Sequence, residues 1–132
     1  MTKHISGLFD VKISPQATAE NDEASIGRML LDKQFHGDLE ASSKGQMLAH
    51  ITSVKGSAGY VAMEKVTGNL QGRKGSFVLQ HSGTMNRGEA TLVLTVVHDS
   101  GTEELEGLSG NMTITIIEGK HIYGFDYSLP EK

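Results

Sequence analysis

The sequence predicts an all-β fold, an eight-stranded antiparallel closed barrel. Apolar and polar residues alternate in stretches along the 132 residues, and a period of two places successive side chains on opposite faces of a strand. Glycine is abundant, at 16 residues, and proline is scarce, at 2, which fits many turns between strands that need their N–H groups. Short connections favour antiparallel neighbours, and eight such strands can close into an up-and-down barrel. A sandwich of two sheets is the alternative fold.

Four strands are expected in the first half of the chain. The first covers residues 5–13, where apolar residues alternate with polar ones, and Pro15 ends it because proline cannot donate to a strand ladder. A polar loop is expected over residues 16–24. The other three strands are expected at residues 25–35, 39–49 and 60–67, separated by a turn at His36–Asp38 and a hairpin loop at residues 53–59.

Four more strands are expected in the second half. Three glycines, Gly68, Gly72 and Gly75, mark a polar loop that leads into the fifth strand. Strands are then expected at residues 75–85, 89–98, 111–118 and 121–129, with turns near residues 86–88 and 118–120 and one short helical turn within residues 102–110.

Composition limits the possible functions. The length suits one domain, residues 1–132, with one core. The chain has no apolar run of 18 residues and no signal-peptide pattern, so we expect a cytoplasmic protein without membrane contact. It contains no cysteine, which excludes disulfides and thiolate chemistry. A net charge of -4 with scattered basic residues argues against nucleic-acid binding.

A family resemblance is carried by the stretch GRKGSFVLQHSGT at Gly72–Thr84. Together with Gly37–Glu40, Met63–Gly68 and Leu94–Gly110, this stretch resembles a bacterial domain-of-unknown-function family that is grouped with allene-oxide-cyclase-like barrels. The resemblance implies an eight-stranded barrel and implies no reaction. No active-site residue of allene oxide cyclase matches a position in this sequence, so none is carried over.

Glu64 is the first candidate catalytic residue. It shares a strand face with Tyr60, and if that face points inward, its neighbour Lys65 points outward. Burial would then raise the pKa of Glu64 and make it a general acid or base, with Tyr60 or His81 as its partner. The alternative is that Glu64 faces solvent or pairs with Arg73 or Lys65.

His81 is the second candidate catalytic residue, because it follows Phe77 and Leu79 in phase. On the inner face it would donate to a ligand or transfer a proton. The alternative is a core histidine bonded to the backbone or to Ser82. Gln80 lies on the opposite face from His81.

The expected interior is largely apolar, with a few polar groups. Its apolar residues are expected to be Phe77, Leu79, Leu92, Leu94, Ile114, Ile116 and Phe125. Tyr60 and Tyr123 are expected to join Glu64 and His81 in orienting a ligand, so the candidate ligand-binding residues are Tyr60, Phe77, Leu79, Leu94 and Tyr123.

A metal site and a cofactor are not expected. The six histidines show no H-x-H or H-x-x-x-H spacing. The run Gly72–Gly75 lacks the rest of a phosphate-binding loop, so we interpret it as a turn.

Two functions remain open from the sequence. The first is binding of an apolar small molecule inside the barrel, with cyclase or isomerase chemistry as the catalytic form of this function; whether the protein is an enzyme stays open. The second is a non-catalytic structural or assembly role, with a packed barrel and a homo-oligomer interface at outer residues such as Val61 and Met63. A cavity of several hundred Å3 would favour the first.

Overall fold

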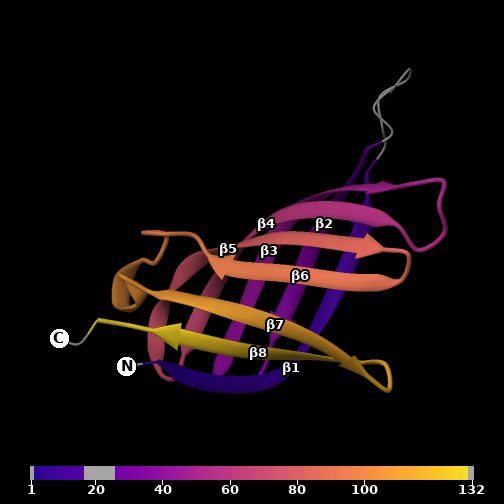
Figure 1. The fold of residues 1–132 in the computed structure, drawn as a ribbon. Coiled ribbons are helices and arrows are strands. Elements are labelled where there is room, and N and C mark those ends of the chain that lie inside the picture. The colour runs from indigo at the N-terminus through magenta and orange to yellow at the C-terminus, as the bar shows by residue number, and fades with distance from the viewer. Residues whose placement is uncertain (1, 17–25, 131–132) are drawn as a thin grey trace.

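The chain folds into one closed antiparallel barrel whose strands follow one another in sequence order (Figure 1). The structure, a computed structural model, describes residues 2–16 and 26–130. Its elements are β1 (Lys3–Pro15), β2 (Gly27–Phe35), β3 (Leu39–Ile51), β4 (Ala58–Leu70), β5 (Arg73–Asn86), β6 (Glu89–Val96), the 3-10 turn η1 (Glu103–Leu105), β7 (Ser109–Ile117) and β8 (Lys120–Ser128). The predicted eight-stranded all-β barrel and its single helical turn are therefore confirmed.

The glycine-rich connection between β4 and β5 is shorter than the sequence suggested. Only Gln71 and Gly72 form the turn, with φ angles of 47° and 84°, as in a two-residue type I′ hairpin. Gly68 and Gly75 are paired with each other inside the two strands. Position 75 requires glycine because a methyl group there would overlap the carbonyl oxygen of Thr102. The expectation of a loop spanning all three glycines is wrong.

Two further hairpins have the same turn geometry and lie where turns were expected. Arg87 and Gly88 have φ angles of 47° and 95°, and Glu118 and Gly119 have φ angles of 50° and 79°. These tight turns keep successive strands adjacent and antiparallel. Most of the predicted loop at residues 16–24 lies outside the described residues.

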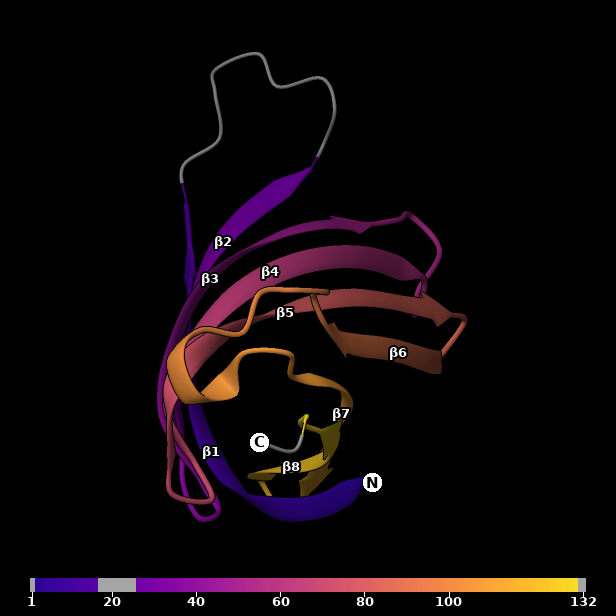
Figure 2. The ribbon, with the colours of Figure 1, turned by 90° about the vertical axis from the view of Figure 1, so that its left-hand side faces the viewer.

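One end of the barrel is closed by the connection between β6 and β7 (Figure 2). Leu105 and Leu108 of this connection are fully buried. The backbone N–H of Ser76 donates to the Thr102 hydroxyl, at 3.0 Å, which ties the connection to β5. Aromatic residues fill the barrel beneath it, including Phe77 and Phe125 with ring centroids 5.8 Å apart.

The opposite end of the barrel is open in the part of the chain that the structure describes. Leu92 and Ile116 continue the inward-facing rows of β6 and β7, as the sequence suggested, but 36% and 64% of their surfaces are exposed. One layer deeper, Leu94 and Met112 are buried. The molecule therefore has a packed half and a half whose apolar interior is accessible.

The barrel is also weakly closed on one side. β6 and β7 are joined by a single pair, Thr95 opposite Asn111, whereas each other neighbouring pair of strands is matched over a long stretch. From this point β6 and β7 diverge toward the open end (Figure 1). We call this weakly paired region, residues 89–95 of β6 facing residues 111–117 of β7, the seam.

Candidate functional site

A cluster of four polar side chains lies inside the barrel at the border between its packed and open halves. The cluster comprises Lys33, Ser43, Glu64 and His81, one from each of the strands β2 to β5, and all four side chains are buried. Lys33 and Ser43 are directly opposite in the register. Glu64 is opposite Gly45, two residues along β3 from Ser43, and His81 is displaced from Glu64 by the same step. Because barrel strands are tilted, these diagonal steps form a continuous row of side chains.

Glu64 is the centre of this cluster. Its Oε1 accepts hydrogen bonds from Lys33 Nζ, at 3.1 Å, and from His81 Nε2, at 3.0 Å. Its Oε2 accepts a hydrogen bond from the Ser43 hydroxyl, at 2.9 Å. The prediction that Glu64 points inward and contacts Tyr60 or His81 is therefore confirmed for His81. The alternative partners Arg73 and Lys65 are not used.

The predicted direction of the Glu64 pKa shift is wrong. Burial by itself raises this pKa, as the sequence suggested, but the hydrogen bond from His81, the charge of Lys33 and the hydrogen bond from Ser43 lower it. The net effect holds the pKa of Glu64 below its ordinary value of 4.5. Glu64 is thus an ionised structural anchor rather than a poised acid.

Lys33 and Ser43 are members of the polar cluster that the sequence analysis did not predict. Position 33 is in phase with the buried residues Leu31 and Phe35, so the alternation itself places its side chain inside the barrel. Lys33 Nζ lies 5.3 Å from the centre of the Phe9 ring and 6.0 Å from that of Phe35. A charged residue at an inward position was the available signal, because such a residue needs a buried partner.

Gly45 makes room for the cluster. A methyl group at position 45 would overlap the Met63 carbonyl oxygen and would lie within 2.6 Å of Glu64 Cβ. β3 therefore has no side chain where Glu64 crosses it. The small residue is needed for this close approach rather than for an unusual backbone angle.

His81 has one ring nitrogen left for another group. Its Nε2 must carry a hydrogen to bond the Glu64 carboxylate, which can only accept. Among the described residues its hydrogen bond is through Nε2, and no fully enclosed side-chain nitrogen or oxygen lacks a partner, so Nδ1 is not fully enclosed although His81 is only 3% exposed. In the neutral ring this nitrogen is a hydrogen-bond acceptor and a base.

Tyr60 lies between the polar cluster and the open end of the barrel. Its ring centroid lies 6.3 Å from that of His81, and the ring lies over Gly83, where a methyl group would overlap it. Partial burial and, secondarily, the negative charge of Glu64 raise the pKa of the Tyr60 hydroxyl. The phenol therefore stays protonated at neutral pH and can donate a hydrogen bond.

A small apolar cavity lies beside Tyr60 at the open end. Its volume is about 180 Å3, and its lining includes Met47, Ala49, Tyr60, Gly83 and Met85. Methionine side chains are flexible and polarisable, so this lining can adapt to ligands of different shape. The cavity is smaller than the several hundred Å3 expected for a typical ligand pocket, because aromatic residues fill the other half of the barrel.

Four of the five predicted ligand-binding residues lie in the packed half. Phe77, Leu79 and Leu94 are fully buried in the hydrophobic core. Tyr123 is also fully buried, and its hydroxyl donates to the backbone oxygen of His36, at 2.9 Å, and accepts from the N–H of Leu39. Only Tyr60 lies beside the cavity.

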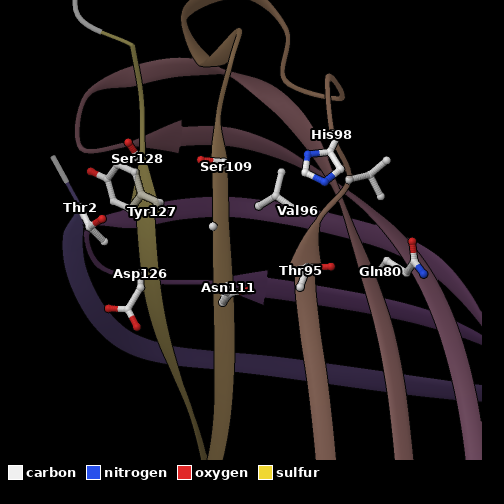
Figure 3. A pocket seen from close by; sticks show the side chains of 12 residues that line it. Thr2, Gln80, Thr95, Val96, His98, Ser109, Asn111, Asp126, Tyr127 and Ser128 are labelled. Carbon is white, nitrogen blue, oxygen red and sulfur yellow. The ribbon is translucent and has the colours of Figure 1, made fainter.

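A larger hollow lies on the outer surface, over the Thr95–Asn111 pair of the seam (Figure 3). Its volume is about 690 Å3, its lining exposes polar and apolar surface in similar amounts, and Gln80 lies opposite Thr95. Asp126, on its margin, is paired with His4 at 2.6 Å. Unlike the inner cluster, this hollow presents exposed amides and hydroxyls rather than buried polar groups.

An apolar row crosses the outer surface of the barrel. Leu48 and Val61 are directly opposite each other on β3 and β4, and Val93 on β6 is level with them beyond Ser82 of β5. About half of each of the three apolar side chains is exposed. Met63 adjoins this row on β4, with 49% of its surface exposed. Val61 and Met63 thus lie on the outer surface, as expected.

A cluster of metal ligands and a membrane-spanning helix are both absent from residues 2–16 and 26–130. No group of three or more histidine, aspartate or glutamate residues among them is arranged to hold a metal ion. No helix among them has the length and apolar character needed to span a bilayer.

Comparisons with known proteins identify relatives but no activity. The model of the family described as "Protein of unknown function (DUF3224)" matches residues 5–127. A crystal structure of a protein of unknown function from the same family, from Shewanella oneidensis MR-1, is 48% identical in sequence. The match covers 99% of this chain and 100% of that chain, with a TM-score of 0.92. No curated protein matches.

Proposed function

Because the chain belongs to the DUF3224 family, whose function is unknown, we propose a function from the site itself: the barrel binds a small apolar molecule at its open end. Tyr60 donates a hydrogen bond to this molecule and His81 accepts one. The grouping of the family with allene-oxide-cyclase-like barrels remains a prediction, as does the cytoplasmic location.

The observation that carries the proposal is the buried cluster around Glu64. A barrel that served only as a packed scaffold would gain more stability from apolar residues at these positions, since burying charges costs free energy. The cluster holds the imidazole of His81 with one nitrogen not fully enclosed, next to a protonated phenol and an apolar cavity. This combination of apolar walls and few oriented polar groups is typical of small-molecule sites.

The same geometry supports a catalytic extension of binding. Glu64 holds His81 by a hydrogen bond to Nε2, and in this proposal the other ring nitrogen removes a proton from the bound molecule. In the same proposal the Tyr60 hydroxyl stabilises negative charge that develops on an oxygen of that molecule. We propose that the base, His81, and the hydrogen-bond donor, Tyr60, are the two side chains used for isomerisation or cyclisation of a confined molecule.

Binding of the neutral fluorophore 1-aminoanthracene tests the proposal. We expect the wild type to bind it, and we expect Met47→Trp, which fills the cavity, to lose binding. Gln46→Trp is the matched control, because this neighbouring side chain points to the outer surface, lies outside the lining of the site, and should leave binding unchanged. Equal binding by both variants, or none by the wild type, would contradict the proposal. If the wild type binds the fluorophore and Met47→Trp does not, mass spectrometry of molecules extracted from the purified protein would identify the natural ligand.

A second candidate function is self-assembly through the outer apolar row. Leu48 and Val61 on adjacent strands, with Val93 two strands away, expose apolar surface that would be covered in a homo-oligomer. Sedimentation velocity of the wild type and of Val61→Glu tests this. A dimer that dissociates in the variant supports assembly, and a monomeric wild type contradicts it.

A further inference from the structure

The one pair between β6 and β7 fixes a register in which the rest of the two strands would also pair, but these further pairs are not formed. Successive antiparallel pairs step in opposite directions along the two strands, so the Thr95–Asn111 pair would be followed by Val93 opposite Thr113 and Leu92 opposite Ile114. The structure forms none of these later pairs among the described residues. The backbone groups that β6 and β7 turn toward each other are therefore left without strand partners.

The inward-facing side chains of the seam are apolar and accessible. Leu94 and Met112, just below the diverging part, are 2% and 3% exposed. Leu92 and Ile116, on the next levels, are 36% and 64% exposed. Accessibility thus rises only beyond the level of Leu94 and Met112, and Ile114, opposite Leu92 in this register, stays partly buried against the core. Leu92 and Ile114 form the apolar inner margins of the seam, while the unpaired backbone groups face each other across it.

The β6 side of the seam adjoins the cavity at the open end. Leu92 is directly opposite Gly83, and Gly83 lines the cavity beneath the Tyr60 ring. Thr91 and Met85, which lie on β6 and β5 at the same end, line the cavity as well. A molecule in the cavity could therefore extend sideways between the two strands.

The occupant that fits the seam is a small molecule rather than a peptide strand. β6 and β7 are antiparallel to each other, so an inserted strand that was antiparallel to one would be parallel to the other. All pairs in this barrel are antiparallel. A compact apolar molecule has no such directional requirement, and Leu92 and Ile114 offer it apolar contacts.

We propose that the seam is a side entrance of the ligand site, through which a small neutral apolar molecule passes between Leu92 and Ile114 to reach Tyr60. The inference rests on the proposed function, since it concerns the route and extent of the same site. When the seam is paired the route is closed, and when β6 and β7 diverge, as in this structure, it is open.

A disulfide across the seam tests the entrance. The natural chain contains no cysteine, so Val93→Cys/Thr113→Cys introduces the only two thiols. Both positions are on the outer face, so the crosslink would fix the paired register without entering the cavity. Association of 1-aminoanthracene with this variant is measured by stopped flow, in the reduced and in the oxidised form.

We expect the reduced variant to bind the probe like the wild type and the oxidised variant to associate on the order of tenfold more slowly, as for a site whose gate is locked. Equal rates in the two forms would overturn the side entrance while leaving the proposed function intact, because the probe would then enter through the open end. No probe binding by the wild type would overturn both.

A second pair of cysteine positions is available in the same register. Glu89→Cys/Ile117→Cys continues the same register to the open end, lies outside the cavity lining, and is used if the first variant does not fold. If neither pair forms a disulfide in folded protein, the seam cannot adopt the paired register, and the inference is wrong.

Discussion

The Glu64 carboxylate lies 3.1 Å from the Lys33 ammonium, and both side chains are buried in the barrel. Opposite charges at this distance attract strongly away from water, but the loss of hydration largely offsets that attraction. The pair therefore contributes little net stability as a whole, whereas either charge left alone is costly. Because one unpaired charge costs more than the intact pair contributes, single and double substitutions should change the free energy of unfolding differently.

We expect Glu64→Gln to lower the free energy of unfolding by about 3–5 kcal/mol, because it leaves the Lys33 charge buried without its partner. Urea unfolding measures the change. Lys65→Gln is the matched control on the next, outward-facing residue, and it should change stability by less than about 0.5 kcal/mol. Similar losses in the two variants would show that the buried charge is not the cause.

Removing both charges is expected to be milder than the single changes suggest. Lys33→Met and Glu64→Gln should each destabilise the protein, while the double variant should recover part of the loss, because no unpaired charge remains. A double-mutant cycle from urea midpoints gives the coupling free energy. Additive losses would mean that the two side chains do not interact.

Stability is expected to fall in acid because of Glu64. The pKa of Glu64 is lower in the folded barrel than its ordinary value of 4.5, so the unfolded chain takes up the proton first as pH decreases. The contribution of Glu64 is therefore complete above about pH 4.5 and is lost as pH falls through the folded-state pKa. Thermal unfolding of the wild type and of Glu64→Gln between pH 7 and pH 3 measures it, and parallel curves would contradict it.

Gly45 is expected to be required for the cluster. Gly45→Ala should cost about 1–3 kcal/mol, since the added methyl group overlaps the β4 backbone and crowds Glu64 Cβ. Gly59→Ala is the control, because the nearest atom to a methyl group there is 4.0 Å away. Chemical denaturation of both variants separates crowding from the general effect of replacing a strand glycine.

The sequence was sufficient for the barrel because the signal for each strand is local. Alternation identified all eight strands, and it put Glu64 in phase with Tyr60 and His81 in phase with Phe77, but it did not decide which face of each strand points inward. The partners of Glu64 depend on register, which joins β2 to β5 and is not visible in any one strand. The same holds for the seam, since β6 is as strand-like in sequence as its neighbours, and only the missing pairs with β7 distinguish it.

Hydrogen exchange should detect the seam directly. Backbone amides that β6 directs toward β7 between residues 89 and 94 have no strand partner, so we expect them to exchange faster than amides between β3 and β4. NMR of the native protein resolves the individual amides. Equal protection in the two regions would indicate that the seam is paired in solution.

The single pair at the seam means that the barrel is in effect a curled sheet in the order β7-β8-β1-β2-β3-β4-β5-β6, with two edge strands that face each other. One of these edges, Thr91–Val96, is uncharged and free of proline, a composition typical of segments that stack into cross-β aggregates. Its position opposite β7 limits access by another chain. Mutations that spread the two edges apart are therefore expected to cause self-association by strand pairing before they cause unfolding.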